Sequence, residues 1–393
     1  MASDIYPHII IDFGSSSIKV GFNGESVSRL VIPNLIGHPK KSFDKIIQDE
    51  NNTYFGYEAL YNSASLSLNY PKLKNNGKIS LEPNELKDIE GILDYIFTKK
   101  LKVKQDNYNV FIVDSLYTNT EERNAIAKIL TEKFNIYNFH MEPQSIMTLY
   151  STAKSSGLVV ESGEIQTTIL PIFEGFIIPN SIYNFPIAGK YLTEQFLNIH
   201  KSELHNVSNK YELAKNIKEK FIEILPVEKY DKIMSKFDKN EFTLPDGIKI
   251  KIGNERYSIP ECLFNSENYG DLKGIHEIIS ESILKLDINI TKEMFNNIIL
   301  GGGNTMIKGF SERLKYEIEK YVNNKIKNKS ENKSVKIQAF DERIYSAWIG
   351  ASGICSFSQF QSKWITKQEY EEKGEVVFND IFSFDSYDFF NKE

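Results

Sequence analysis

The chain of 393 residues is longer than a single hydrophobic core usually supports, so we expect two lobes. Its composition, 41% hydrophobic and 25% charged, is typical of a globular protein, and its net charge of −6 gives no indication of a basic face for nucleic acid. Cys262 and Cys355 are too few and too far apart for a disulfide framework or a zinc site.

Residues 1–8 lack an apolar signal region. No run of apolar residues approaches the length of a membrane span. We therefore expect an intracellular protein in a reducing compartment, without direct contact to a membrane or to nucleic acid.

The first predicted element is a β-hairpin over residues 9–22. Aliphatic residues run into Asp12, a glycine and serines follow, and Ile18, Val20 and Phe22 then alternate along a second strand. This pattern predicts a buried strand, a tight turn and a half-buried return strand. An ordinary hairpin without a ligand is the alternative, because many hairpins carry glycine and serine.

The polar residues of this hairpin suit a phosphate and its metal ion. Gly14 permits close backbone approach, and the turn amides with the hydroxyls of Ser15 and Ser16 form a concavity suited to phosphate oxygens. Asp12 is a candidate metal ligand through water, because magnesium keeps most of its waters. Lys19 adds a positive charge for phosphate.

A polar loop, helices and a buried strand are predicted next. Apolar residues at helical spacing predict the helices, and an uninterrupted apolar run predicts the strand. These segments are the loop Ser42–Thr53, the helices Pro83–Phe97, Glu121–Phe134 and Gln144–Ala153, and the strand Asn109–Asp114.

A second hairpin repeats the pattern of the first. Leu158–Val160 run into Glu161, and Gly163 follows. Glu164–Ile172 then form the return strand. Two such hairpins facing each other would clamp one polyphosphate and its metal ion, so the repeat implies two related halves and a central cleft.

The remainder of the chain alternates helices and strands. A glycine loop after the strand that begins at Asn297 could receive a nucleoside, because glycines let a base or sugar lie against the backbone. Lys218 and Glu219 either flank an adenine or form an ordinary solvated helix face. The predicted helices are Gly189–His200, Tyr211–Ile224, one opening at Gly274–Glu277, and Phe310–Tyr321, while Leu244–Gly247 is a turn between strands, Asn323–Ser334 a loop and Ile344–Tyr370 a helix-rich segment.

Taken together, these motifs resemble actin and the actin-related proteins over nearly the full length of the chain. The hairpins match the family's two phosphate loops, the second over Glu161–Gly175, and Ile299–Gly309 matches its adenosine loop. Further matches lie at Leu244–Gly247, Ile252–Tyr257, Gly274–Glu277, Ala347–Gly350 and Trp364–Tyr370.

The resemblance implies an α/β fold of two lobes, each with a ribonuclease-H-like sheet flanked by helices, and Mg-ATP or Mg-ADP in the cleft between them. It also implies four subdomains. The expected ranges are 1–33, 72–151 and 345–393 for the first large subdomain, 34–71 for the small one on it, 152–187 and 273–344 for the second large subdomain, and 188–272 for the small one on that lobe.

Roles for individual residues follow from the same resemblance. Gln144 would orient the attacking water, and Glu161 would act beside it, with Thr168 at the position where the family has a histidine. Asp12 and Glu161 would lie around the metal ion and bind it through water. The residues expected around the nucleotide are Gly14, Ser15, Ser16, Lys19, Gly163, Glu164, Ile165, Gly189, Lys218, Glu219, Gly302, Gly303, Asn304 and Met306.

The chain departs from the family most at this chemistry. Thr168 replaces the histidine that helps position and polarise the hydrolytic water, an effect worth about 10²–10⁴-fold in rate. Ile165 stands where a glycine normally lets the phosphate approach, so its branched side chain could block the γ-phosphate. The resemblance therefore predicts ATP binding with slow or lost hydrolysis. The other departures are Phe13 for asparagine, Ser16 for glycine, and Glu161 and Glu164 for aspartates.

The surfaces expected to mediate polymer contacts also differ. The loop Ser42–Thr53 corresponds to the family's subunit-gripping loop, and Ile46 and Ile47 are its only apolar pair. Lys363 and Gly353 replace apolar residues in the groove where that loop and many actin-binding helices dock. A charge there costs affinity for an apolar anchor. These differences favour a subunit of a larger assembly in the cytoplasm and cytoskeleton, or in the nucleus.

Three classes of function remain open. The favoured one is an ATP-binding structural or regulatory subunit whose partners are actin-like filaments, complex subunits or actin-binding proteins. The second is a filament-forming divergent actin that hydrolyses ATP. The third, a sugar kinase or chaperone ATPase on the same scaffold, is disfavoured, because we find no separate catalytic base and too few residues for a substrate-binding domain.

Overall fold

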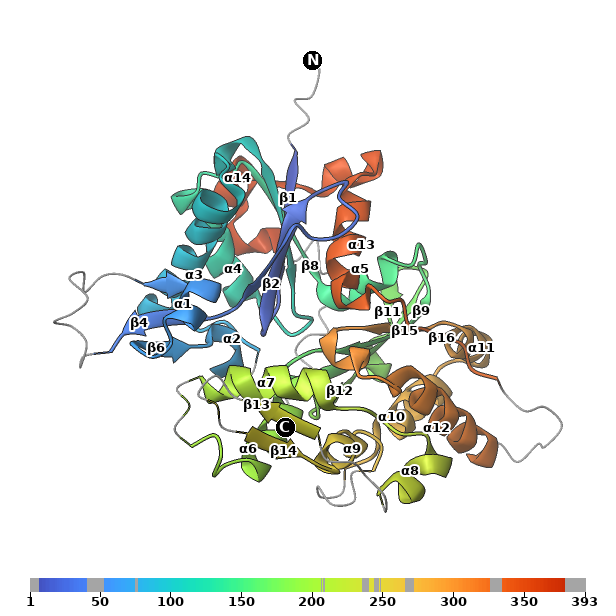
Figure 1. Cartoon of the computed structure of the whole chain (residues 1–393). Helices are drawn as coiled ribbons and strands as arrows, with labels where there is room; N and C mark the ends of the chain where they lie inside the picture. Colours follow the sequence, from blue (N-terminus) through green and yellow to red (C-terminus); the bar gives the residue numbers. More distant parts are fainter. Residues whose placement is uncertain are drawn as a thin grey trace. The chain divides into compact units, whose positions relative to one another are not determined.

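The computed structural model describes residues 7–40, 53–74, 77–205, 207, 209–234, 240–243, 247, 249–265, 272–325 and 334–378. The chain divides into two compact units, Met1–Ala153 with Tyr345–Glu393 (unit 1) and Lys154–Ile344 (unit 2). Figure 1 shows that each unit combines a sheet with flanking helices. No helix within the described ranges has both the length and the apolar character of a membrane span.

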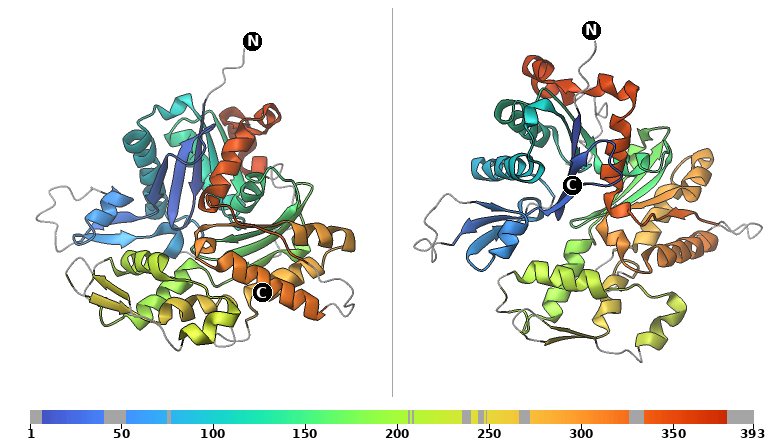
Figure 2. Two further views of the ribbon diagram at one scale, coloured as in Figure 1. Left: turned by 45° about the vertical axis from the view of Figure 1, so that its right-hand side comes forward. Right: turned by 45° about the horizontal axis from the view of Figure 1, so that its top comes forward.

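The main sheet of unit 1 has six strands in the order β17-β8-β7-β1-β2-β3. Neighbours among β1, β7 and β8 are parallel, and the other pairs are antiparallel. A smaller sheet, in the order β5-β4-β6, extends to one side of it in Figure 2. The strands are β1 (His8–Phe13), β2 (Ser17–Phe22), β3 (Leu30–Pro33), β4 (Ile36–Pro39), β5 (Tyr54–Phe55), β6 (Leu66–Asn69), β7 (Asn109–Asp114), β8 (Asn138–Pro143) and β17 (Ile365–Thr366).

Helices cover both faces of this sheet. Successive residues of a strand point to opposite faces, so a single strand can contribute to the core on each side. Ile9 and Ile11 of β1 belong to the core that α3 and α4 cover, while Ile10 packs with Trp348 of α13 on the opposite face. Figure 1 shows α3 and α4 on one side of β1 and α13 on the other. The indole N–H of Trp348 also donates to the carbonyl of Ile10 over 3.1 Å. The helices of unit 1 are α1 (Tyr57–Tyr61), α2 (Pro71–Lys74), α3 (Pro83–Asp94), α4 (Thr120–Lys128), α5 (Gln144–Tyr150), α13 (Ser346–Cys355) and α14 (Lys367–Lys373), with π-helical continuations at Tyr95–Leu101 and Ile129–Lys133.

Unit 2 has a sheet in the order β11-β10-β9-β15-β16, with β12 paired to β10, and a separate hairpin of β13 and β14. Helices α10 and α11 pack on β10 and β9, and α12 packs on α10. The strands are β9 (Gly157–Ser162), β10 (Thr167–Phe173), β11 (Phe176–Ile177), β12 (Tyr183–Phe185), β13 (Asn240–Thr243), β14 (Lys249–Ile252), β15 (Ile298–Gly301) and β16 (Ile337–Gln338). The helices are α6 (Gly189–Ile199), α7 (Lys210–Phe221), α8 (Val227–Met234), α9 (Glu255–Glu261), α10 (Ile275–Leu284), α11 (Ile288–Asn296) and α12 (Phe310–Lys325).

Most predicted elements are present, with helix ends that differ by a few residues. The helix predicted over Pro83–Phe97 is α-helical to Asp94 and then π-helical to Leu101. The loop predicted over Asn323–Ser334 was placed too early, because α12 continues to Lys325 and buries Val322 on its core face. The segment Ile344–Tyr370 is helix-rich but contains β17, where Ile365 aligns with Phe139 of β8. Residues 42–52, 244–246 and 326–333 of the predicted loops and turn lie outside the described residues.

A close approach between α13 and α5 in unit 1 provides a test of this packing. A Cβ atom on Gly350 of α13 would lie 1.8 Å from the carbonyl oxygen of Met147 in α5. Gly350→Ala is therefore expected to lower the free energy of unfolding by about 3 kcal/mol, measured by chemical denaturation.

Gly353→Ala on the same helix is the matched control. Nothing lies within 4 Å of a Cβ atom at that position, and alanine in a helix is expected to raise stability by about 0.5–1 kcal/mol. Equal stabilities of the two variants would contradict the close contact between α13 and α5.

Candidate functional site

The turn of the first hairpin lies between β1 and β2. In the paired strands Asp12 is opposite Lys19 and Phe13 is opposite Ile18, and Gly14–Ser16 form the turn before β2 begins at Ser17. The ammonium of Lys19 donates to the carboxylate of Asp12 over 2.6 Å, and both side chains are buried. Because buried charges have lost their water, they need such close pairing. The ion pair therefore fixes the two strands where the turn begins.

Residues from outside the hairpin bind the carbonyl groups of this turn. The side-chain amide of Asn34 donates to the carbonyl of Gly14 over 2.9 Å, and its backbone N–H donates to the carbonyl of Ser16 over 3.0 Å. The ammonium of Lys72 donates to the carbonyl of Phe13 over 2.7 Å and lies 4.9 Å from the centre of the phenyl ring. These contacts hold the turn within unit 1.

Two backbone N–H groups of the same turn donate to no group in the part of the protein that the structure describes. Within the described part of the chain, the backbone N–H groups of Gly14 and Ser15 have no hydrogen-bond acceptor. A Cβ atom on Gly14 would lie 2.6 Å from the carbonyl oxygen of Ser17, so the turn needs glycine there. Adjacent N–H groups in a tight turn form a concavity that binds anions.

The second hairpin repeats the register of the first. Glu161 is opposite Thr168, and Ser162 is opposite Thr167. The acid and its cross-strand partner are as far apart in the sequence as in the first hairpin. The predicted repeat is thus confirmed, with a neutral threonine opposite the acid where the first hairpin has a lysine.

The second turn also leaves amides available. The N–H of Gly163 closes it by donating to the carbonyl of Gln166 over 3.2 Å. The N–H groups of Glu164 and Ile165 have no acceptor among the residues that the structure describes. The side chain of Ile165 is half-buried and is not part of the described hydrophobic core of unit 2.

The glycine loop after β15 approaches this hairpin closely. Gly302 has a φ of +83°, and a Cβ atom there would lie 2.3 Å from the carbonyl oxygen of Ser162 and 3.0 Å from Oε1 of Glu161. The side-chain amide of Asn304 donates to the hydroxyl of Ser162 over 3.0 Å. The predicted adenosine loop and the second turn therefore lie against each other within unit 2.

Helices α6 and α7 contact the second turn as well. The hydroxyl of Tyr211 donates to Oε1 of Glu164 over 2.5 Å. The ammonium of Lys218 donates to the carbonyl of Gly189 over 2.9 Å, and burial lowers the pKa of this lysine. Glu219 is exposed. Of the predicted adenine pair, Lys218 thus supports the start of α6, and only Glu219 is open to solvent.

Comparison with known families agrees with this architecture. The Actin family model matches residues 3–381, nearly the whole chain. The chain belongs to the actin family. Its α/β, two-lobed fold, expected from the resemblance, is thereby confirmed. Proteins of this family generally bind ATP or ADP with Mg²⁺ and interact with other proteins.

In this member of the actin family the predicted site residues divide between the two units. Gln144 is the half-buried first residue of α5, and Gly303 and Met306 are exposed on a short 3₁₀ turn. Unit 1 contains Asp12, Gly14, Ser15, Ser16, Lys19 and Gln144, and unit 2 contains Glu161, Gly163, Glu164, Ile165, Thr168, Gly189, Lys218, Glu219, Gly302, Gly303, Asn304 and Met306.

For a metal ion the chain offers the carboxylates of Asp12 and Glu161, which supply the oxygen ligands that Mg²⁺ prefers. Both residues are buried, and Asp12 already binds Lys19. The described ranges contain no group of three or more His, Cys, Asp and Glu side chains that could hold a metal ion. An ion bound through its own waters does not need such a group, so the role of these acids stays a prediction.

Asn34, Lys72 and Tyr211 were missed by the sequence analysis. Lys72 is 59 positions from Phe13 in the sequence, and Tyr211 is 47 positions from Glu164. No local periodicity connects residues at such separations. A single polar side chain in an ordinary segment gives no signal of its own, so only the tertiary fold identifies these contacts.

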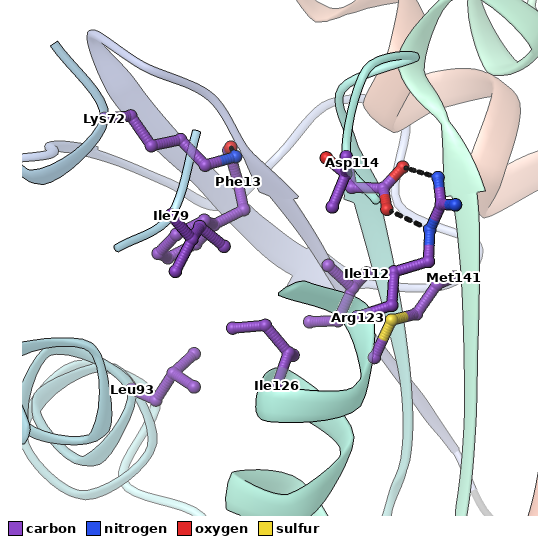
Figure 3. Close-up of a pocket in the computed structure, with 10 residues that line it drawn as sticks. Phe13, Lys72, Ile79, Leu93, Ile112, Asp114, Arg123, Ile126 and Met141 are labelled. Carbon is purple, nitrogen blue, oxygen red and sulfur yellow. Dashed lines mark hydrogen bonds and ion pairs between the residues drawn. The ribbon is translucent and has the colours of Figure 1, made fainter. Parts of the chain in front are cut away.

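Lys72 also lines a small cavity next to the first hairpin, which Figure 3 shows. Its volume of about 10 Å³ is enough for about one water molecule. Asp114 and Arg123 line it as a buried pair, with nitrogen–oxygen distances of 2.7 and 3.3 Å. Burial lowers the pKa of Lys72, although the nearby carboxylates of Asp114 and Glu122 oppose this. Burial thus disfavours the charged form of Lys72. Its hydrogen bond to Phe13 and the nearby carboxylates offset part of this cost.

Lys72→Met is expected to lower the free energy of unfolding by about 1–3 kcal/mol at neutral pH, because the carbonyl of Phe13 loses its donor. Burial lowers the pKa of Lys72 in the folded state, so the unfolded chain binds more protons at this residue. The stability of the wild type relative to the variant should therefore rise with pH in the window below 10.5, the ordinary lysine value.

Denaturant unfolding between neutral and alkaline pH measures this difference. Lys99→Met is the control, because Lys99 is exposed, and it should have little effect at any pH. A difference between wild type and Lys72→Met that is independent of pH would contradict a buried lysine whose charge is disfavoured.

Proposed function

We propose that this chain is an Mg-ATP-binding actin-related protein that serves as a structural or regulatory subunit of a multiprotein assembly, with weak or no ATP hydrolysis. The observation that carries the binding part is the pair of repeated turns, each with adjacent amides left without an acceptor among the described residues. Membership of the actin family supports the same ligand.

Each unit would contribute one phosphate-binding turn. In unit 1 the amides of Gly14 and Ser15 would donate to phosphate oxygens, with Lys19 as a point charge. In unit 2 the amides of Glu164 and Ile165 would do the same. Asp12 and Glu161 would hold Mg²⁺ through water, and the bound ion would neutralise part of the phosphate charge.

The nucleoside would lie at the glycine loop. Gly303 and Met306 are exposed there, and Gly302 brings the backbone against the second turn. Backbone without side chains lets a flat base or a sugar approach closely. Glu219 is the exposed member of the pair on α7, while Lys218 would act by supporting Gly189.

Weak hydrolysis follows from the residues around the predicted water. Thr168 is buried opposite Glu161, and a threonine hydroxyl does not accept a proton near neutral pH as an imidazole does. Gln144 remains to orient a water molecule. Positioning without proton transfer supports slow turnover, so the nucleotide would act mainly as a structural ligand.

The assembly role rests on the exposed residues of unit 1. Lys363 and Gly353 are both exposed and offer no apolar anchor at the positions where the family has one. Protein partners in the cytoplasm and cytoskeleton, or in the nucleus, fit such a subunit. A filament-forming actin that hydrolyses ATP is the second candidate, because Gln144 is retained and family membership fits both functions.

We also propose the four-subdomain division given by the resemblance. The small sheet of β4, β5 and β6 falls within 34–71, and α6 to α9 fall within 188–272. The first large subdomain would then be 1–33, 72–151 and 345–393, and the second 152–187 and 273–344, with a boundary two residues before the division between the units at Ala153. This division would place each predicted phosphate turn in a large subdomain.

The first experiment is chromatography of the nucleotide released by denaturing the purified protein after incubation with Mg-ATP. We expect bound ATP that stays ATP. Accumulation of bound ADP during the incubation would favour the filament-forming ATPase. Finding neither nucleotide would overturn the binding part of the proposal.

Ile165→Gly tests whether the branched side chain limits access to the second turn. The variant is expected to bind Mg-ATP about tenfold more tightly if the side chain obstructs the γ-phosphate. The substitution keeps the backbone N–H of residue 165 and removes the branched side chain. Ile165→Val is the matched control and should bind like the wild type. Calorimetric titration of each variant measures the change, and equal affinities would show that Ile165 does not limit binding.

A further inference from the structure

The carboxylate of Glu164 is held within unit 2. Its Oε1 accepts the hydroxyl of Tyr211 of α7 over 2.5 Å. Its Oε2 lies against the start of α6, because a Cβ atom on Gly189 would be 2.6 Å from it. One hydrogen bond and one close approach therefore fix a charged side chain of the second turn.

The main chain of the second turn is bound to the same helix. The N–H of Gly189 donates to the carbonyl of Gly163 over 3.0 Å, and the N–H of Lys190 donates to the carbonyl of Glu164 over 2.6 Å. The carbonyl of Gly189 in turn accepts from the buried ammonium of Lys218. The start of α6 therefore supports both the backbone and the carboxylate of the turn.

Tyr211 is suited to hold this carboxylate at any physiological pH. Burial, and next the charge of Glu164, raise the pKa of its hydroxyl well above the usual range, so the hydroxyl stays a donor. A negative charge beside the N-terminus of a helix is also favoured by the helix dipole. Both effects stabilise Glu164 in its place on α6.

We propose that Tyr211 is a positioning residue for phosphate binding at the second turn: it keeps the Glu164 carboxylate on α6 and so leaves the amides of Glu164 and Ile165 to the phosphate. The inference rests on the proposed nucleotide-binding function. A carboxylate released from Tyr211 would be able to turn toward the bound phosphate, and the two negative charges would repel. Tyr211 acts through Glu164.

Tyr211→Phe removes only the hydroxyl. In calorimetric titration of the full chain with Mg-ATP, it is expected to raise Kd about tenfold, the effect of losing one hydrogen bond to a charged group. Glu164→Gln removes the repelling charge and is expected to bind at least as tightly as the wild type. In that background the tyrosine substitution should change Kd by less than about twofold, because the two residues act as one unit. Tyr316→Phe, an exposed tyrosine of α12, is the matched control.

Amide hydrogen exchange gives a readout that needs no nucleotide. Exchange at Gly189 and Lys190 is expected to speed up in Tyr211→Phe and to stay unchanged in Tyr316→Phe, since these amides donate to the turn that Tyr211 holds. Gly189→Ala, whose Cβ atom would displace the carboxylate, should weaken Mg-ATP binding in the same way.

Three results would overturn the inference. The first is unchanged amide exchange in Tyr211→Phe. The second is an equal loss of affinity in the wild-type and Glu164→Gln backgrounds, which would show that Tyr211 does not act through Glu164. The third is an unchanged affinity for Mg-ATP in Tyr211→Phe. A wild-type chain that binds no Mg-ATP would instead contradict the proposed nucleotide-binding function. Binding that is indifferent to Tyr211 would leave that function standing and remove only this role.

Discussion

In both repeated turns the carbonyl groups are bound by donors from elsewhere in the same unit, while the half-buried residues Gly14, Ser15, Glu164 and Ile165 have N–H groups without an acceptor among the described residues. In the first, Asn34 and Lys72 bind carbonyl groups, and in the second the start of α6 does so. These contacts hold the backbone of each turn in place, which would lower the cost of ordering it in the proposed phosphate binding.

The two turns share a register but differ in charge. Asp12 faces Lys19 across the first pair of strands, so this turn carries a neutralised acid. Glu161 faces the neutral Thr168 across the second, and the nearby Glu164 is held by a hydroxyl. The two turns therefore differ in the groups that offset their acids: a direct ion pair in the first, and the Tyr211 hydroxyl with the nearby Lys215 and Lys218 of α7 for Glu164 in the second.

The sequence predicts the hairpins because their information is local. Aliphatic runs, an acid and a glycine turn lie within a few positions of each other, and each pattern allows one register that buries its apolar face. The repeat is visible for the same reason. The supports of the turns are not local: Lys72 and Tyr211 reach them from distant segments, and in the sequence they resemble ordinary surface residues. The role expected of Lys218 shows the same limit, since its ammonium binds backbone within unit 2.

The departures from the family pattern act unequally on binding and on chemistry. Phosphate binding by backbone amides depends on the conformation of the turn, and many side chains are compatible with one conformation. Hydrolysis depends on the chemical identity of the groups near the water, and Thr168 cannot supply what an imidazole would. A chain that changes residues at these positions while keeping the register of both hairpins is therefore expected to lose turnover before it loses the nucleotide. The second turn has the register of the first and a glutamate fixed on α6, a geometry that fits the proposed phosphate binding.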